Sequence, residues 1–296
     1  MKTQGLPLPN DERAGPGGPE PEQELVETVI EPRRGWAPLN LRELRGHRDL
    51  LYFLVLRNLK VRYKQTVLGA GWAVIQPVMI MVVFTLVFGR LARLSSDGSP
   101  YALFSFAALV PWVYFSNALT QASNSIVQNE RLVTKVYFPR ILVPLAAVVA
   151  GLVDLAIAFV VLLGLTVAFG VLPRLDLLIV PPLVLLVVVS ALGAGTCLAA
   201  LNVYHRDVRY AVAFLIQFWL FISPVAYSSS IVPDAWRPLY ALNPMVGVID
   251  GFRWALLDDA PSPFLNLAIS AASATTVLLI GLYYFRRVED AFADVV

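Results

Sequence analysis

Charged side chains that could do chemistry are few in this chain, and Asp154 is the one acid deep within an apolar segment, GLVDLAIAF. A carboxylate in such a segment is costly unless it is protonated, paired or turned toward a protein interior or a wet cavity. A proton relay or a contact with substrate would use such a group. A relay needs several of them, however, so we interpret Asp154 as one partner of a hydrogen bond between two helices.

Charged residues also occur together in the segment VGVIDGFRWALL and just after it. Asp250 and Arg253 lie three residues apart, a spacing that would let them pair on one face of a helix. Asp258 and Asp259 follow directly, and two adjacent carboxylates at a helix end are more often solvated than catalytic. We therefore predict a structural role for the first pair and contact with solvent for the second.

Sequence motifs for catalysis or nucleotide binding are missing. The chain contains no GxxxxGK(S/T) phosphate loop, no Gly-x-Ser-x-Gly elbow, no His-Glu-x-x-His and no Cys-x-x-Cys. Cys197 is the only cysteine, and the two histidines, His47 and His205, lie far apart. We therefore predict no catalytic residue, no metal site and no cofactor in this chain. Energy from a nucleotide would have to come from a partner.

Composition is typical of an integral membrane protein. The residues are 57% hydrophobic and 15% charged, with a mean hydropathy of +0.67, whereas soluble domains carry about 25% charged residues. The net charge of +2 arises from bases near the ends of apolar segments, which form no basic domain. Membrane topology explains these bases, and no nucleic-acid partner is expected.

Six apolar stretches are long enough to cross a bilayer, because a helix needs about 20 residues to span roughly 30 Å of hydrocarbon. They cover residues 71–92, 102–123, 141–168, 177–201, 210–227 and 264–285. An even number of spans returns the chain to its starting side, and Lys and Arg are more frequent on that side. The sequence therefore predicts an all-α protein with six transmembrane helices and both termini in the cytoplasm.

Three regions follow from these patterns. Residues 1–31 are rich in Pro, Gly and Glu and are predicted to form a disordered acidic tail in the cytoplasm. Residues 32–66 contain the segment 48–64, which is predicted to be an amphipathic helix lying among lipid headgroups at the membrane interface. Residues 67–296 form the six-span membrane domain.

The segment 48–64 carries its charges at helical spacing. Arg57, Lys60 and Lys64 recur at intervals of three and four residues and share one face. An apolar stripe is assigned to another face and consists of Leu50, Phe53, Leu54 and Val61. Arg62 adds a fourth base. An alternative role for all four bases is that they only anchor the chain on the cytoplasmic side of the membrane.

Two connections between spans are longer and more structured than a simple turn requires. Residues 123–140 are predicted to form a short helix that ends before Pro139 and exposes Asn129, Glu130, Arg131 and Lys135. Residues 228–262 are broken by Pro233, Pro238, Asn243 and Pro244, and their second part is predicted to re-enter the membrane as helices between the fifth and sixth spans. Broken backbone is tolerated there if protein or water satisfies it. The alternative is an amphipathic lid on the outer surface.

Aromatic residues in two spans could stack on the apolar faces of sugars and so line a conduit. The candidates are Trp112 and Phe115 in the second span and Phe214, Phe218 and Phe221 in the fifth, where intervals of four and three residues place them on one stripe. The competing explanation is ordinary packing within spans or an aromatic belt at the interface.

Long ordered strings of the sequence carry a family resemblance. They are RDLLYFLVLRNLKVRYKQTVLGAGWAVIQPVMIMVVFTLVFGRLA, LVPWVYFSNALTQASNSIVQNERLVTKVYFPRILVPLAAVVAGLVD and LNPMVGVIDGFRWALL. The chain from about Arg33 to its C-terminus resembles the permease subunits of lipopolysaccharide O-antigen ABC exporters, which belong to the type-2 ABC exporter permeases. Members of that family also export capsule and teichoic acid.

The resemblance implies a homodimer in the bacterial inner membrane that carries two copies of a separate ATPase, which binds ATP and magnesium. It implies ATP-driven export of an undecaprenyl-diphosphate-linked O-antigen polysaccharide through a channel at the homodimer interface, so this chain would be a transporter permease and not an enzyme. A carbohydrate-binding domain on the ATPase would favour O-antigen over other substrates.

The resemblance also assigns roles to residues. Coupling to the ATPase would involve Asn129, Glu130, Arg131, Lys135 and Tyr137. A gate formed by the re-entrant helices would involve Asn243, Pro244, Asp250 and Arg253. From charge and position we add the hypothesis that anionic lipid or the carrier diphosphate meets Arg57, Lys60, Arg62 and Lys64 at the cytoplasmic entrance.

Other functions remain open at this point. A permease of the same superfamily for capsule, teichoic acid or a small hydrophobic drug differs only in its substrate. A membrane enzyme of lipid-linked glycan synthesis would need several more acids or histidines, and an ion-coupled transporter would need an internal repeat and several buried ionisable residues.

Overall fold

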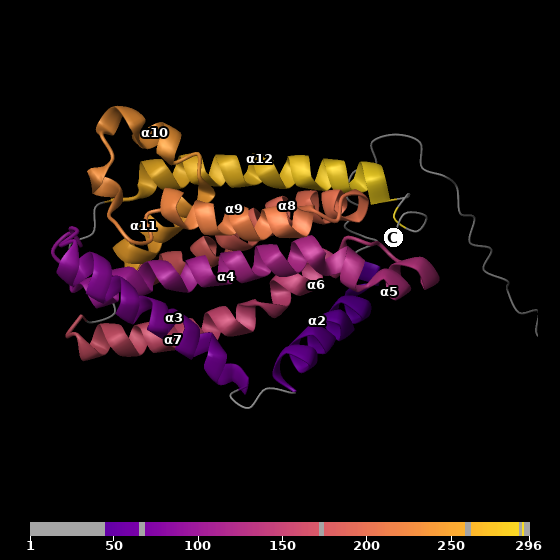
Figure 1. The fold of residues 1–296 in the computed structure, drawn as a ribbon, viewed down its shortest axis with the longest axis horizontal. Helices are drawn as coiled ribbons and strands as arrows, with labels where there is room; N and C mark the ends of the chain where they lie inside the picture. Colours follow the sequence, from indigo (N-terminus) through magenta and orange to yellow (C-terminus); the bar gives the residue numbers. More distant parts are fainter. Residues whose placement is uncertain (1–44, 65–68, 172–174, 258–261, 290–291, 293–296) are drawn as a thin grey trace, which may run out of the picture. The chain divides into compact units, whose positions relative to one another are not determined.

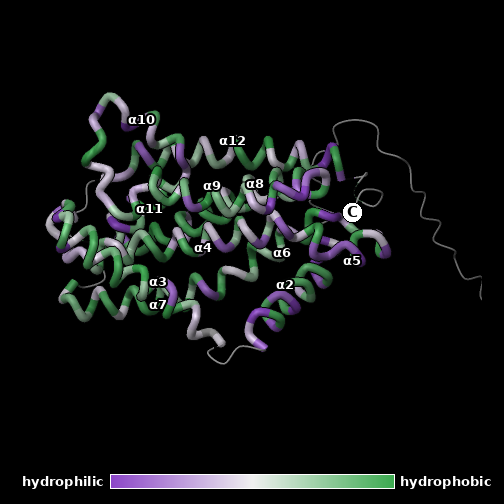
Figure 2. The backbone as a smooth tube through the Cα atoms, viewed as in Figure 1, coloured by the Kyte–Doolittle hydropathy of each residue, from purple (hydrophilic) through white to green (hydrophobic). Residues whose placement is uncertain are grey.

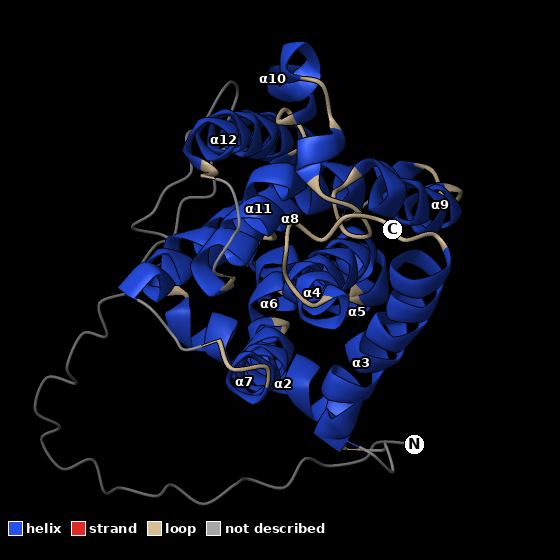
Figure 3. Ribbon diagram, turned by 90° about the vertical axis from the view of Figure 1, so that its left-hand side faces the viewer, coloured by secondary structure: helices blue, strands red, loops and turns tan. Residues whose placement is uncertain are grey.

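The computed structural model describes residues 45–64, 69–171, 175–257, 262–289 and 292. The described residues all belong to one compact unit, Trp36–Val296. The predicted acidic tail (residues 1–31) and the pair Asp258 and Asp259 lie outside the described residues. The regular secondary structure in these ranges is entirely helical, with no β-strand, and the helices are joined by loops and turns (Figures 1 and 3).

The helices follow one another along the chain and are connected mostly by short turns. The α-helices are α2 (Arg48–Tyr63), α3 (Trp72–Phe84), α4 (Tyr101–Gln128), α5 (Glu130–Lys135), α6 (Leu142–Ala150), α7 (Leu152–Ala168), α8 (Val180–Tyr204), α9 (Val208–Ile222), α10 (Arg237–Tyr240), α11 (Pro244–Leu256) and α12 (Phe264–Val288). Shorter helical pieces are η1 (Gly69–Gly71), η2 (Thr85–Leu91), η3 (Leu175–Ile179), η4 (Ser229–Ile231) and η5 (Asp234–Trp236).

Five helical stretches in the described ranges have the length and apolarity of membrane spans. They are Trp72–Leu91, Tyr101–Gln128, Leu142–Ala168, Leu175–Tyr204 and Phe264–Val288, and they correspond to five of the six predicted spans. The chain is thus a multi-pass, all-helical membrane protein. Figure 2 shows apolar residues along these stretches and a concentration of hydrophilic residues around α5.

The stretch predicted to span at 210–227 is a shorter helix. α9 has 15 residues, which at 1.5 Å per residue rise about 22 Å, less than the roughly 30 Å of a hydrocarbon core. Ser223 leaves the helix with φ −95° and ψ 149°, because Pro224 disfavours the helical conformation in the residue before it. The apolar run is therefore longer than the helix it forms.

α4 is the helix around which the others pack. It contacts α3, α6, α7, α8, α9 and α11, and Figure 3 shows it among them in an end-on view. Its residues from Leu103 to Trp112 are all buried. We use α4 to name the two ends of the helices: the α11 end, where α4 begins, and the α5 end, where it stops.

Small residues bring α8 and α12 into close contact. A Cβ atom added to Gly281 on α12 would lie 2.1 Å from the carbonyl oxygen of Gly193 on α8. A Cβ atom on Gly193 would lie 2.6 Å from the Cα atom of Leu278. Close backbone approach of this kind is typical of helix packing in membranes, where dispersion contacts replace the hydrophobic effect.

The short helix predicted within residues 123–140 is divided differently. α4 continues to Gln128, Asn129 interrupts it with φ −113° and ψ 26°, and α5 contains only six residues. Asn129 makes this break because its side chain donates a hydrogen bond to the carbonyl oxygen of Ser125 at 2.7 Å. The second span is therefore longer, and the separate helix shorter, than the sequence pattern suggested.

The predicted apolar stripe of α2 is also divided. Leu54 is buried and Leu50 packs with it in a core at the α5 end, whereas Phe53 is 66% and Val61 75% exposed. Phe53 precedes Arg57 by four residues, so it belongs to the face that carries the cations. The assignment of Phe53 to a separate apolar face was wrong.

Candidate functional site

A groove with a mixed polar and apolar lining lies between the C-terminal end of α2 and helices α3, α4 and α7. It has a volume of about 290 Å³, and its lining includes Trp72 and Gln76 of α3 and Tyr114, Asn117 and Gln121 of α4. The three amide side chains are exposed. Sequence reasoning missed this groove, although Asn117 and Gln121 are spaced by one helical turn on α4.

One wall of the groove contains Asp154, which is held by two side chains of α2. Arg62 forms an ion pair with the Asp154 carboxylate, and the hydroxyl of Tyr63 donates a hydrogen bond to its other oxygen. Burial and the hydrogen bond to Asp154 raise the pKa of Tyr63 to about 12. The interpretation of Asp154 as a partner in a helix-to-helix hydrogen bond is confirmed, and α2 is the helix that supplies the donors.

The position of Asp154 follows from a break in the third span. Gly151 separates α6 from α7, and a Cβ atom at Gly151 would lie 3.1 Å from the ring of Tyr114 on α4. The Tyr114 hydroxyl donates a hydrogen bond to the carbonyl oxygen of Val148 at 3.1 Å. Asp154 therefore lies in the first turn of α7, where its carboxylate reaches α2.

The cations of α2 have different surroundings. Arg57 donates a hydrogen bond to the Asn129 side chain at the start of α5, so the structure brings together one residue from each of two predicted sites. Lys60 and Lys64 are exposed and line a groove of about 510 Å³ with Arg57, Phe53, Leu56 and Val61. Arg62 is engaged by Asp154 and faces the other groove.

The predicted coupling residues lie on and next to α5. Glu130, Arg131 and Lys135 are exposed, and Tyr137 is 78% exposed. Val133 is buried and attaches α5 to the core at the α5 end. The result is a short helix held by one apolar side and presenting a charged surface to solvent.

The five aromatic residues predicted to line a conduit are not brought together. Trp112 and Phe115 are buried in the core, where the Phe115 ring meets the Trp219 ring edge-on at a centroid distance of 5.1 Å. Phe214, Phe218 and Phe221 are more than half exposed on α9. The rings of Phe214 and Phe218 are stacked at a centroid distance of 6.5 Å.

α11 is a buried helix. All of its residues except Trp254 are buried, and it contacts α4, α8 and α12, which does not fit an amphipathic lid. Asn243 caps its N-terminus by accepting a hydrogen bond from the Met245 amide at 3.1 Å. The same side chain accepts from the Trp219 indole at 2.9 Å and donates to the Ser223 hydroxyl at 2.9 Å. Asn243 therefore ties the end of α9 to the start of α11.

Arg253 satisfies backbone that is far away in the sequence. Its guanidinium donates hydrogen bonds to the carbonyl oxygens of Val225 at 3.1 Å, Tyr227 at 3.2 Å and Phe104 at 3.4 Å. It also lies 3.5 Å from the centroid of the Phe104 ring, and it is only 3% exposed.

The predicted pairing of Asp250 with Arg253 was wrong, because no ion pair joins these two described residues. Asp250 instead accepts a hydrogen bond from the Asn266 amide at 3.4 Å. Arg253 does not pair with Asp250 because its long side chain reaches the carbonyl oxygens of residues outside α11.

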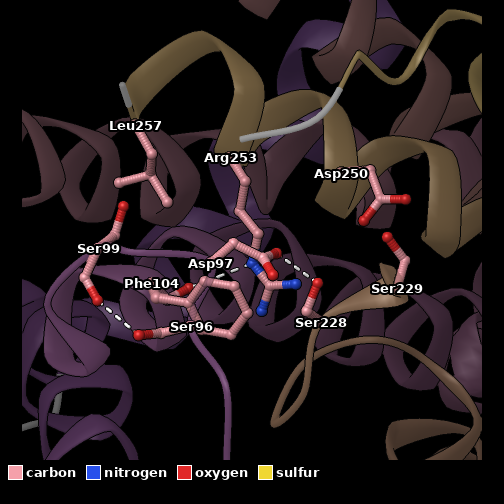
Figure 4. A pocket seen from close by; sticks show the side chains of 9 residues that line it. All are labelled: Ser96, Asp97, Ser99, Phe104, Ser228, Ser229, Asp250, Arg253 and Leu257. Carbon is pink, nitrogen blue, oxygen red and sulfur yellow. Dashed lines mark hydrogen bonds between the residues drawn. The ribbon is translucent and has the colours of Figure 1, made fainter. Parts of the chain in front are cut away.

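Figure 4 shows the small cavity around these groups, with Arg253 above the Phe104 ring and near Asp97 and Ser228. Asp97 accepts hydrogen bonds from the hydroxyls of Ser228 and Ser230. The cavity has a volume of about 10 Å³, which is about the space for one water molecule. The hydrogen bonds of Asp97, Ser228 and Ser230 therefore connect two loops, and the cavity beside them is too small to be a ligand pocket.

Comparison with known proteins finds relatives over most of the chain. Residues 49–257 match the family described as ABC-2 type transporter. The chain is 33% identical over 256 residues to the O-antigen export system permease protein RfbA of Myxococcus xanthus, an alignment that covers 85% of this chain and 97% of that protein.

More distant relatives match with similar coverage. The identity is 24% over 248 residues with the O-antigen export system permease protein RfbA of Klebsiella pneumoniae, covering 83% of this chain and 95% of that protein. It is 22% over 246 residues with the polysialic acid transport protein KpsM of Escherichia coli, covering 80% of this chain and 93% of that protein.

Proposed function

Because the chain belongs to the ABC-2 type transporter family, we propose that it is the inner-membrane permease subunit of an ATP-driven polysaccharide exporter. Its substrate is an O-antigen polysaccharide linked to undecaprenyl diphosphate. The observation that carries this proposal is the alignment at 33% identity with nearly the full length of an O-antigen export permease. The similarity to a polysialic acid transport protein points to the same broad class of cargo.

The topology we propose has six spans, with α9 as the fifth and α11 as a re-entrant helix. The broken backbone after α9 is compatible with membrane depth because side chains satisfy its carbonyl groups. Arg253 donates to Val225 and Tyr227, and the Tyr101 hydroxyl donates to Ala226 at 2.5 Å. These side chains provide the hydrogen-bond donors that lipid cannot offer to the carbonyl groups.

The α5 end faces the cytoplasm in this proposal, and both termini lie on that side. Basic residues support the orientation, since Lys135 on α5, Arg206 in the turn between α8 and α9, and Arg286 in the last turn of α12 lie at the α5 end. α2 then lies at the cytoplasmic interface, with its exposed lysines among lipid phosphates.

Two copies of a separate ATPase dock on the exposed charged surface of α5 in this proposal. The contact between Arg57 and Asn129 gives a direct route from α5 to α2. The ion pair between Arg62 and Asp154 continues that route from α2 to α7. A movement of α5 would thus reach a span through contacts made by side chains.

The conduit forms between two copies of this chain. The exposed phenylalanines of α9 and the exposed amides of α4 lie on surfaces that a single chain leaves open, and polar groups within a span need a protein or aqueous neighbour. Stacked aromatic rings such as Phe214 and Phe218 suit the apolar faces of sugars.

Deletion of the gene tests the substrate. The expected result is loss of surface polysaccharide and accumulation of the lipid-linked polymer inside the cell, both reversed by the wild-type chain. Unchanged surface polysaccharide together with a new sensitivity to a hydrophobic drug would instead favour a drug permease.

A further inference from the structure

The groove between α3, α4 and α7 contains polar groups that the exposed conduit surface of α9 does not explain. We propose that this groove binds one uncharged sugar residue of the exported polymer. This inference rests on the proposed function and adds a sugar site to it, set apart from the aromatic face of α9.

The amide side chains define the hydrogen-bonding character of the groove. Gln76 on α3 and Asn117 and Gln121 on α4 line it together. Within the described ranges no hydrogen bond engages these three amides, and all are exposed. Each amide offers two donor hydrogens and an acceptor oxygen, and in a bilayer such groups need partners. Sugar hydroxyls both donate and accept and so match them.

Charge excludes the diphosphate as the ligand of this groove. Arg62 and Asp154 are the charged residues in its described lining, and each neutralises the other. An anion would have to displace Asp154 from Arg62, and a cation would have to displace Arg62 from Asp154. The groove therefore suits a neutral group with many hydroxyls.

Size and aromatic lining limit the ligand to about one ring. The volume of about 290 Å³ lies just below the roughly 300–1,000 Å³ that is usual for small-molecule pockets. Trp72 is 53% exposed at the edge of the groove, and Tyr114 is buried behind it. An indole face at the mouth can cover the apolar face of a sugar ring, while the amides meet its hydroxyls.

Photo-crosslinking in growing cells tests this site directly. p-Benzoylphenylalanine is placed at Gln76 or Gln121 in the groove, at Phe218 on the aromatic face, or at Leu265, which is 70% exposed on α12. The polymer is labelled through radioactive sugars. We expect labelled glycan on the chain with the probe at both groove positions and at Phe218, and none with the probe at Leu265.

Other crosslinking results would overturn the sugar site. Glycan captured at Phe218 but at neither groove position would overturn the sugar site and leave the proposed function standing. Phospholipid captured in place of glycan at Gln76 and Gln121 would also overturn the site. Failure of the proposed function is recognised separately, because surface polysaccharide would then be normal in the deletion strain.

Variants that replace an amide side chain with an apolar one of similar size add a quantitative test. Asn117→Leu and Gln121→Leu should each lower the yield of glycan captured at Gln76 by about fivefold, the factor that corresponds to one lost neutral hydrogen bond. Gln128→Leu removes an exposed amide from the same helix outside the groove and should leave the yield unchanged. Equal yields in all three variants would contradict the proposed hydrogen bonds.

Discussion

Replacing Arg253 by methionine removes a guanidinium that satisfies three carbonyl groups and covers an aromatic ring. The carbonyls of Phe104, Val225 and Tyr227 would each lose a donor, at about 1–3 kcal/mol for a buried group left unsatisfied. The cost of burying the cation disappears at the same time and offsets part of this loss. We expect Arg253→Met to lower the free energy of unfolding by about 3–5 kcal/mol.

Two further variants separate the charge from the geometry. Arg253→Lys keeps the charge but lacks the planar fork of donors, so it should recover only about half of the loss. Arg237→Met is the matched control, because Arg237 bonds to Val232 and pairs with Asp234 but is 42% exposed. A surface contact of this kind is worth about 0–1 kcal/mol.

Titration of the purified protein with SDS in mixed micelles measures these differences, with tertiary structure followed by near-ultraviolet circular dichroism. The account requires the order wild type, Arg237→Met, Arg253→Lys and Arg253→Met, from most to least stable. If Arg253→Met were as stable as Arg237→Met, the argument that Arg253 satisfies the broken backbone would be refuted.

Three other changes probe different parts of the molecule. Asp154→Leu should lower export several-fold by leaving Arg62 unpaired, and the double variant with Arg62→Met should recover part of the lost export. Arg48→Met on the same helix should have no effect on export. No recovery in the double variant would contradict the coupling through the pair of Arg62 and Asp154. Gly281→Ala should cost more than about 3 kcal/mol, since its Cβ atom would meet the α8 backbone at 2.1 Å, and a near-normal unfolding midpoint would disprove the close contact. Neutralising Lys60 and Lys64 together should slow export but leave dimer assembly intact, as judged by surface polysaccharide and native mass; unchanged export would remove the hypothesis of an anion at this helix.

Hydropathy was sufficient for the parts of the fold that depend on length and apolarity. The stretch Leu142–Ala168 agrees with its predicted span to within one residue at each end. α9 shows the limit, because an apolar run to Tyr227 does not reveal that Pro224 ends the helix at Ile222. Local backbone chemistry, and not hydropathy, sets that boundary.

The candidate site was predictable only where the partners are close in sequence or obvious in type. Asp154 stood out as an isolated acid, but its partners on α2 are more than 90 residues away. Arg253 was assigned to Asp250 by helical spacing, whereas its true acceptors lie 26, 28 and 149 residues away. Contacts of this range depend on how the helices pack, which a single sequence does not report.

Reconstitution measures the ATP-driven movement of a polysaccharide through this chain. The chain is purified with its co-eluting ATPase and placed in liposomes that contain the cell's own lipid-linked polysaccharide. We expect ATP to drive transfer of the glycan to the side away from the ATPase, where an added glycosidase no longer reaches it. Glycan that remains fully accessible with ATP, in vesicles whose ATPase is active, would contradict the account.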